Sequence, residues 1–453
     1  MRIRRILPVL LTLAVAGCEE TLTVEPAAEV PETRAIVDRT SAAAALAGIY
    51  DGLQDASYYG GDFYFFADLS SDNVEHAGTF NTYREVEQNA LRADNGDIET
   101  VWEAMYLTIG RANDLITKLP NVTDPALTED ERNQWLGEAY LARALTYHNL
   151  VKLFGGVPIV TEPPTDLTEA AQVARATVAE VYAQIKADLD QAEALMVEDF
   201  SRRGGSISAV HAIRARVLMF ESTIFPGSAN WQAVEDEAQA VIDFGFELAP
   251  NFADLFTPTG SDTPEDIYRL EFTAVDFALT GFYYLRRANG GRQELRPTAN
   301  LAALFTAGDE RRARTIGLTS AGARFGNKWI DAVGDEDLHI IRLAEVLLIK
   351  AEAHARQNEL AQAVAEYNKV RVRAGLAPHV LGVNVTTQQQ VLEEIWRQRR
   401  LELAYEADRW PELVRLGLAV SVMNLANRPH QVLYPIPQAE LDVAPNLVQN
   451  PGY

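Results

Sequence analysis

The feature that most constrains the fold is residues 340–376, which can bury their apolar side chains only as two short antiparallel helices. Apolar residues recur there at helical spacing on both sides of a polar break, residues 357–359. Tyr367 is placed to fill the gap between the two helices, and Gly375 ends the second one. Small residues stand where the two backbones must approach closely: Ala351, Ala355 and Ala363.

This spacing resembles that of a tetratricopeptide repeat, a helical hairpin with small and bulky residues at fixed positions. The matching residues are Ala351, His354, Leu360, Ala363 and Tyr367. A single unit of this kind is equally compatible with an ordinary helical hairpin. Evidence from the rest of the chain is needed to distinguish a repeat from such a hairpin.

Helical patterns fill both ends of the chain. Capping-box pairs predict that helices begin after Thr128, Thr177 and Thr387. We expect Trp102, Tyr106 and Tyr367 to be core residues between helices. The expected long helices are residues 41–53, 97–119, 129–154, 178–196, 207–224, 231–244 and 388–406.

Three stretches lack long helical patterns. Residues 57–93 are rich in aromatic and loop-forming residues, and residues 250–338 carry more Gly, Pro, Thr and aromatics. We expect the second stretch to be an irregular insertion with a few short strands. The proline-bearing tail, residues 432–453, is expected to be extended. The predicted fold is therefore mainly α, with helix hairpins as a scaffold and irregular loops.

The N-terminus has the pattern of a bacterial lipoprotein signal. Arginines precede an apolar run too short for a stable membrane anchor, and the run ends at Val15-Ala16-Gly17-Cys18. We expect residues 1–17 to be removed, Cys18 to be lipidated, and residues 18–40 to form an extended tether. A single domain would follow over residues 41–453. Its expected parts are residues 41–245 (helical), 250–338 (insertion) and 339–453 (helical, with the extended tail).

Charge and missing motifs argue against several functions. The 40 basic and 64 acidic residues give a formal net charge of −24, so nucleic acid is not an expected partner. The sequence has no phosphate-binding loop, nucleophile elbow or HExxH motif, so we expect no catalysis, metal or cofactor. Three histidines are interpreted as packed or surface residues: His148, His211 and His354. Charged residues near the last long helix are interpreted as a structural ion-pair network: Arg399, Glu402, Glu406 and Arg409.

Motifs spread over the whole chain match one known family. In the N-terminal half they are residues 102–113, 137–160 and 175–189. In the C-terminal half they are residues 296–311, 342–353, 368–375, 399–415, 433–437 and 449–453. Together they resemble the SusD/RagB family of nutrient-binding outer-membrane lipoproteins. Gln398 and Ala407 differ from the glutamate and the glycine that are usual at these two positions in the family. We expect these differences to affect only local packing.

The resemblance implies a SusD-like α-α superhelix that carries no catalytic activity. It also implies a lipid-anchored protein on the extracellular side of the outer membrane, acting as the lid of a SusC-like TonB-dependent transporter. The ligand would be a glycan or, for a RagB-like lid, a peptide. A lipidated helical-repeat scaffold for assembly is the alternative from another class, and a hydrolase with an unrecognised site is a further one.

Two loop stretches offer what a sugar-binding site needs. A flat aromatic ring covers the apolar face of a sugar, and polar groups satisfy its hydroxyls. The first candidate set is Asp72, Asn73, Phe80, Tyr83 and Arg84. The second is Tyr283, Tyr284, Arg286, Asn289 and Arg292. The alternative is that these aromatics only pack the loops onto the scaffold.

Replacing Cys18 with alanine is expected to leave a soluble or signal-retained precursor, because one apolar signal segment cannot anchor the mature chain. Metabolic labelling with a fatty acid tests this, with label expected on the wild type and not on Cys18→Ala. Undiminished label on the variant would show that another residue carries the lipid.

Overall fold

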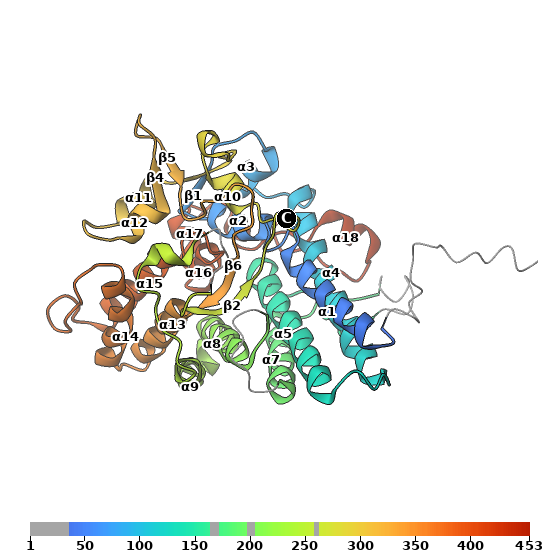
Figure 1. Cartoon of the computed structure of the whole chain (residues 1–453). Helices are drawn as coiled ribbons and strands as arrows, with labels where there is room; N and C mark the ends of the chain where they lie inside the picture. Colours follow the sequence, from blue (N-terminus) through green and yellow to red (C-terminus); the bar gives the residue numbers. More distant parts are fainter. Residues whose placement is uncertain (1–35, 164–171, 197–203, 258–261) are drawn as a thin grey trace, which may run out of the picture.

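The computed structural model describes residues 36–163, 172–196, 204–257 and 262–453, and more than half of these residues are helical (Figure 1). The expected signal peptide, Cys18 and nearly all of the expected tether lie outside these residues. Among the helices described, none has both the length and the apolar character needed to cross a membrane.

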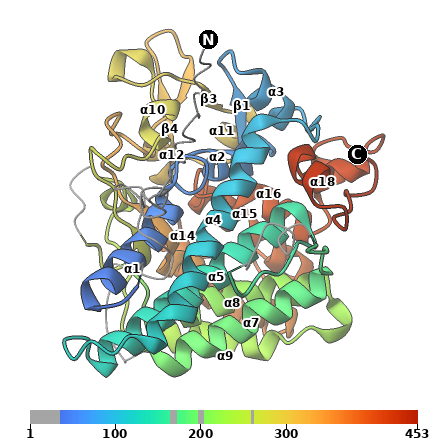
Figure 2. The same cartoon turned by 90° about the vertical axis from the view of Figure 1, so that its right-hand side faces the viewer.

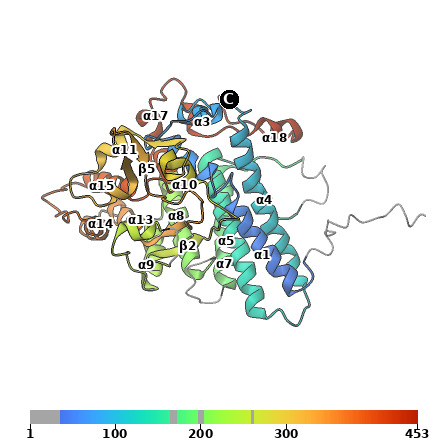
Figure 3. The ribbon, with the colours of Figure 1, turned by 45° about the horizontal axis from the view of Figure 1, so that its top comes forward.

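Long helices pack side by side as a series of hairpins, and each one contacts the next (Figures 1 and 2). In order, they are α1 (Arg39–Gln54), α4 (Gly96–Lys118), α5 (Glu129–Phe154), α7 (Val178–Leu195), α8 (Ile207–Ile224), α9 (Trp231–Asp243), α13 (Leu343–Arg356), α14 (Leu360–Arg373) and α15 (Gln388–Glu402). Figure 3 shows α1, α4, α5 and α7 running alongside one another at one side of the molecule. The predicted mainly α fold, built on helix hairpins, is confirmed.

Side-chain caps set where several long helices begin. Thr128, Thr177 and Thr387 each accept a hydrogen bond from the backbone N–H three residues further on. In return, the side chain at that third position accepts a bond from the N–H of the cap residue. The three predicted capping boxes are therefore confirmed. Gly375 follows α14 with a φ of +79°, in the left-handed region that favours glycine.

The hairpin of α13 and α14 buries the residues predicted to hold it together. Its small contact residues and Tyr367 are fully buried. Trp102 is also buried, whereas Tyr106 is partly exposed and donates a hydrogen bond through its hydroxyl to the Pro158 carbonyl oxygen, at 2.8 Å. The prediction that the first helix begins at residue 340 is wrong. Residues 338–342 form a strand instead, because pairing with residues 266–270 provides their backbone hydrogen bonds.

Short antiparallel strand pairs connect segments that are far apart in the sequence. The pairs are β1 (Val74–His76) with β3 (Leu295–Pro297), β2 (Asp266–Leu270) with β6 (Leu338–Arg342), and β4 (Ile316–Leu318) with β5 (Arg324–Gly326). Three short helices accompany them: α10 (Thr280–Tyr284), α11 (Ala299–Leu304) and α12 (Arg311–Thr315). The buried apolar side chains of these elements and of the long helices form one continuous cluster.

Several short helices were not predicted. They are α2 (Asp62–Leu69), α3 (Asn81–Glu87), α17 (Ala419–Val422) and α18 (Gln438–Val443); α16 (Arg409–Arg415) follows α15. The prediction that the tail is extended is wrong for residues 438–443, because the prolines of the tail flank this short helix and do not interrupt it. Every residue of α2 after Asp62 is buried, so this helix shows no amphipathic period that sequence reading could detect. The helix predicted through residue 406 ends at Glu402, because Tyr405 and Ala407 adopt positive φ angles of 67° and 58°.

A network of buried ion pairs lies between the strands and the last helices. Arg342, on β6, donates hydrogen bonds at 2.6 to 2.8 Å to carboxylate oxygens of Glu265, Glu402 and Glu406. Burial alone raises the pKa of Glu406, but Arg342 and Lys328 outweigh it and lower this pKa to about 2. The structural interpretation of the charged residues is confirmed, although Arg399 pairs with Glu345 and Asp408, and Arg409 with Asp72.

Truncating Tyr367 to alanine is expected to lower the free energy of unfolding by about 3–5 kcal/mol, as for other buried aromatics. Val372→Ala, at a residue of the same helix that is 55% exposed, is the matched control and should change the free energy by less than about 0.5 kcal/mol. Denaturant melts measure both values. Equal stability of the two variants would contradict the described packing of α13 against α14.

Replacing Arg342 with methionine is expected to cost about 3–5 kcal/mol, because three buried carboxylates lose their shared partner. Arg92→Met removes an arginine from an exposed pair with Asp94 and should leave the midpoint of denaturant unfolding nearly unchanged. If the two variants unfold at the same denaturant concentration, the buried network does not stabilise the fold.

Candidate ligand-binding site

A surface pocket of about 850 Å³ lies where the β1–β3 pair meets α10 and the turn that follows it. These elements gather at one end of the molecule, at the top of Figures 1 and 2, away from α7, α8 and α9. The lining residues are Ala77, Gly78, Thr79, Phe282, Arg286, Arg287, Ala288, Gly291, Arg292, Gln293, Glu294, Arg296 and Thr319.

The orientation of the short helix α10 determines which aromatic rings reach the pocket. Gly281 and Tyr284 lie on its buried side, while Phe282 and Tyr283 remain partly exposed. A side chain on Gly281 would collide with the carbonyl oxygen of Asp331, so only glycine fits at this contact. This orientation places Phe282 on the wall of the pocket.

Further aromatic rings lie beside this wall. The ring of Tyr283 is 5.6 Å from that of Phe282 and 6.5 Å from that of Phe80, measured between ring centroids. The guanidinium of Arg292 stacks 4.4 Å from the centroid of Phe80. Beside this wall, aromatic rings and the Arg292 guanidinium therefore lie next to one another, and the Arg292–Phe80 geometry favours a cation–π contact.

Most of the charge on the pocket wall is positive. Arg286, Arg287, Arg292 and Arg296 line it, and Glu294 is the one carboxylate among its lining residues. Glu294 pairs with Arg292 and contacts the His76 imidazole at 3.2 Å.

The structure brings part of the predicted binding set to this pocket. Arg286 and Arg292 line it, and Phe80 and Tyr283 belong to the adjoining aromatic group. Two predicted residues, Arg84 and Asn289, are exposed but do not line the pocket. The Asn289 side chain instead accepts a hydrogen bond from Arg286 Nε at 2.8 Å, which positions that arginine.

Four predicted contacts have structural roles instead. Asp72 pairs with Arg400 and Arg409, and Asn73 is fully buried, where its amide donates to Asp68 at 2.7 Å. The other two are aromatic: Tyr83 and Tyr284.

Those two aromatics are buried in the structure. Tyr284 is fully buried, and its ring stacks on that of Tyr405 at 4.5 Å. The buried Tyr83 donates its hydroxyl to Asp62, whose pKa burial raises to about 7. Truncating either tyrosine is therefore expected to destabilise the fold, contrary to the interpretation of both as loop contacts for a ligand.

Several residues that line the pocket were not predicted from the sequence: Phe282, Arg287, Arg296 and residues 77–79. A helical period read over residues 280–284 would have separated Phe282 from Tyr284. Residues 77–79 reach the pocket because β1 pairs with β3. The sequence around these strands contains no local pattern that predicts this pairing.

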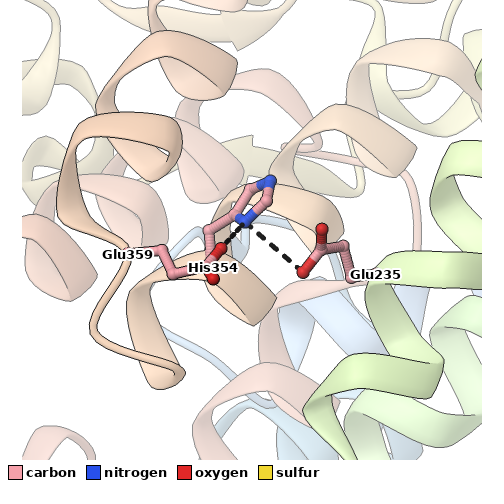
Figure 4. A group of neighbouring side chains, drawn as sticks. All are labelled: Glu235, His354 and Glu359. Carbon is pink, nitrogen blue, oxygen red and sulfur yellow. Dashed lines mark hydrogen bonds and ion pairs between the residues drawn. The ribbon is translucent and has the colours of Figure 1, made fainter.

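One group of side chains could hold a cation (Figure 4). His354 Nδ1 lies 2.7 Å from Glu359 Oε2 and 3.5 Å from Glu235 Oε2. Gln357 also donates to Glu235, at 2.8 Å, so the group fastens the α13–α14 turn to α9. These hydrogen bonds explain the cluster without a metal. Of the other histidines, His148 is fully buried and His211 bonds Glu237.

Two other surface pockets are smaller. One, of about 280 Å³, contains Tyr50 and Glu138, which hydrogen-bond each other. The other, of about 190 Å³, has on its wall Trp102, which is only 2% exposed, and the partly exposed Tyr106. An enclosed cavity of about 20 Å³ beside Asn149 has room for little more than a water molecule.

Comparison with known proteins places the chain in a family. Residues 22–219 match a SusD-like family described as starch-binding and associating with the outer membrane, and residues 326–431 and 417–453 match the SusD family. SusD-like protein P2 of Formosa agariphila is 28% identical, over 90% of this chain and 92% of its own length. A laminarin-binding SusD-like protein of known structure is 25% identical, with a TM-score of 0.78 over 92% of this chain and all of its own. A SusD superfamily structure from Bacteroides vulgatus reaches a TM-score of 0.80 at 19% identity, covering 92% of this chain and 99% of its own. The chain belongs to the SusD/RagB family.

Proposed function

We propose that this chain binds a glycan in the pocket between residues 77–79 and 282–296. The observation that carries the proposal is a partly exposed aromatic ring, Phe282, surrounded by arginines and by hydroxyl and amide groups on one concave wall. We further propose that it does so as a lipoprotein anchored through Cys18, serving as the lid of a SusC-like TonB-dependent transporter.

The pocket matches the physical needs of sugar binding. Its volume of about 850 Å³ lies within the range usual for small-molecule sites, roughly 300–1,000 Å³. The ring of Phe282 offers an apolar surface for the C–H face of a sugar. The side chains of Thr79, Gln293 and Thr319 can exchange hydrogen bonds with hydroxyls that would otherwise be buried without partners.

The same wall argues for binding without hydrolysis. A glycosidase uses two carboxyl groups that face each other across the scissile bond, about 5–9.5 Å apart. Among the described residues that line this pocket, Glu294 alone has a carboxylate, and it pairs with Arg292. A single, already paired carboxylate does not supply a general acid and a nucleophile or base.

The family supports the remaining parts of the proposal. Its description as starch-binding and associating with the outer membrane fits a glycan ligand and a surface location. The laminarin-binding relative supports a glycan rather than the peptide of a RagB-like lid. A helical-repeat scaffold without a ligand would leave the arrangement around Phe282 unexplained.

Replacing Phe282 with alanine is expected to weaken glycan binding about tenfold or more, equivalent to about 1.4 kcal/mol. Its partial exposure should keep the change in melting temperature small. Phe277→Ala is the matched control, because Phe277 is 49% exposed and does not line the pocket.

Calorimetric titration with a panel of neutral and acidic oligosaccharides measures both variants against the wild type. Loss of affinity in Phe282→Ala alone supports the pocket as the binding site. Wild-type affinity in Phe282→Ala would move the site elsewhere, and tighter binding of peptides than of any glycan would favour a RagB-like lid.

A further inference from the structure

We propose that the pocket selects glycans that carry acidic groups, either uronate carboxylates or sulfate esters. This inference rests on the proposed glycan-binding function and adds the chemical class of the ligand. It starts from an excess of guanidinium groups on the wall that holds Phe282.

The pocket wall has more arginines than there are nearby carboxylates to pair with them. Glu294 pairs with Arg292, and Glu75 is shared between Arg296 at 2.6 Å and Arg324 at 3.6 Å. The other two arginines of the wall are Arg286 and Arg287. Among the residues that the structure describes, no carboxylate forms an ion pair with either of them.

This local excess contrasts with the chain as a whole. The formal net charge is −24, so acidic residues outnumber basic ones over the chain. Some surface arginines outside the pocket pair with carboxylates, as Arg92 does with Asp94 and Arg111 with Asp51, whereas the exposed Arg312 forms no ion pair among the described residues. A pocket that keeps two arginines without such partners presents a positive surface on an acidic protein, which attracts anionic ligands.

The arginines are also held in place for a ligand. Arg286 donates through Nε to Asn289 and lies over the ring of Phe325, 5.3 Å from its centroid. Among the described residues, its two terminal nitrogens have no hydrogen-bond partner. A guanidinium fork fixed in this way matches the geometry of a carboxylate or a sulfate and can bind two of its oxygens at once.

Replacing Arg287 with glutamine tests the inference, because this exposed side chain has no hydrogen-bond or ion-pair partner in the part of the chain that the structure describes. Lys369→Gln removes the same charge from α14, outside the pocket, and is the matched control. The probes are oligogalacturonate (carboxylate), carrageenan oligosaccharides (sulfate), laminarin oligosaccharides (neutral) and a polyglutamate peptide.

The wild type should bind at least one acidic oligosaccharide about tenfold or more tightly than laminarin oligosaccharides. Arg287→Gln should lose about tenfold of that affinity and a smaller factor of its affinity for the neutral probe, whereas Lys369→Gln should change neither. Binding of the acidic probe should also weaken as the ionic strength rises from about 0.01 M to about 0.15 M, because the Debye length falls from about 30 Å to about 8 Å. The tighter of the two acidic probes identifies the group as carboxylate or sulfate.

Each of the other outcomes would contradict a different part of the proposal. If neutral oligosaccharides bind as tightly as acidic ones and still depend on Phe282, charge selection is wrong and the glycan site stands. Equal affinities of Arg287→Gln and the wild type for the acidic probe would likewise overturn charge selection alone. Preference for polyglutamate over every glycan, or no dependence of any probe on Phe282, overturns the glycan site as well.

Discussion

Arg342 ties together parts of the chain that no continuous helix connects. It leaves the end of β6 and bonds Glu265, which precedes β2, together with Glu402 and Glu406, in and just after α15. Arg373 adds bonds from α14 to Glu265 and Glu402. Such pairs are costly to bury and costlier to break, because removing one partner leaves an unpaired charge in the interior. The irregular segment between the helical halves is therefore fixed at one place on the scaffold.

The pocket depends on this fixed segment. With β2 and β6 held against the last helices, residues 280–297 can pair with residues 74–77 through β1 and β3, where Glu75 lies opposite Arg296. Arg400 and Arg409 bind Asp72 from the side of the helices and hold the incoming strand. The aromatic ring and the arginines of the wall thus sit on short elements and turns, Phe282 on α10 and Arg296 on β3, that the helical scaffold positions, which is a usual arrangement of a binding site.

Sequence reasoning predicted what depends on local signals. The capping boxes at Thr128, Thr177 and Thr387 and the small residues of the α13–α14 hairpin were correct because each acts within one or two helical turns. It failed where burial is set by distant segments. Tyr284 and Asn73 look like loop residues in the sequence but are fully buried. Arg287 and Phe282 gain their significance only from residues 77–79, brought near by pairing over a long separation.

We propose that the wall formed by Phe282 and its neighbouring arginines holds the ligand of this protein. A crystal structure of the protein with a bound oligosaccharide is the decisive measurement. We expect an ordered sugar ring against Phe282, with an acidic group of the ligand within hydrogen-bond distance of Arg286 or Arg287. Ordered sugar residues beside Tyr50 and Glu138, or beside Trp102, with the pocket at Phe282 empty, would contradict it.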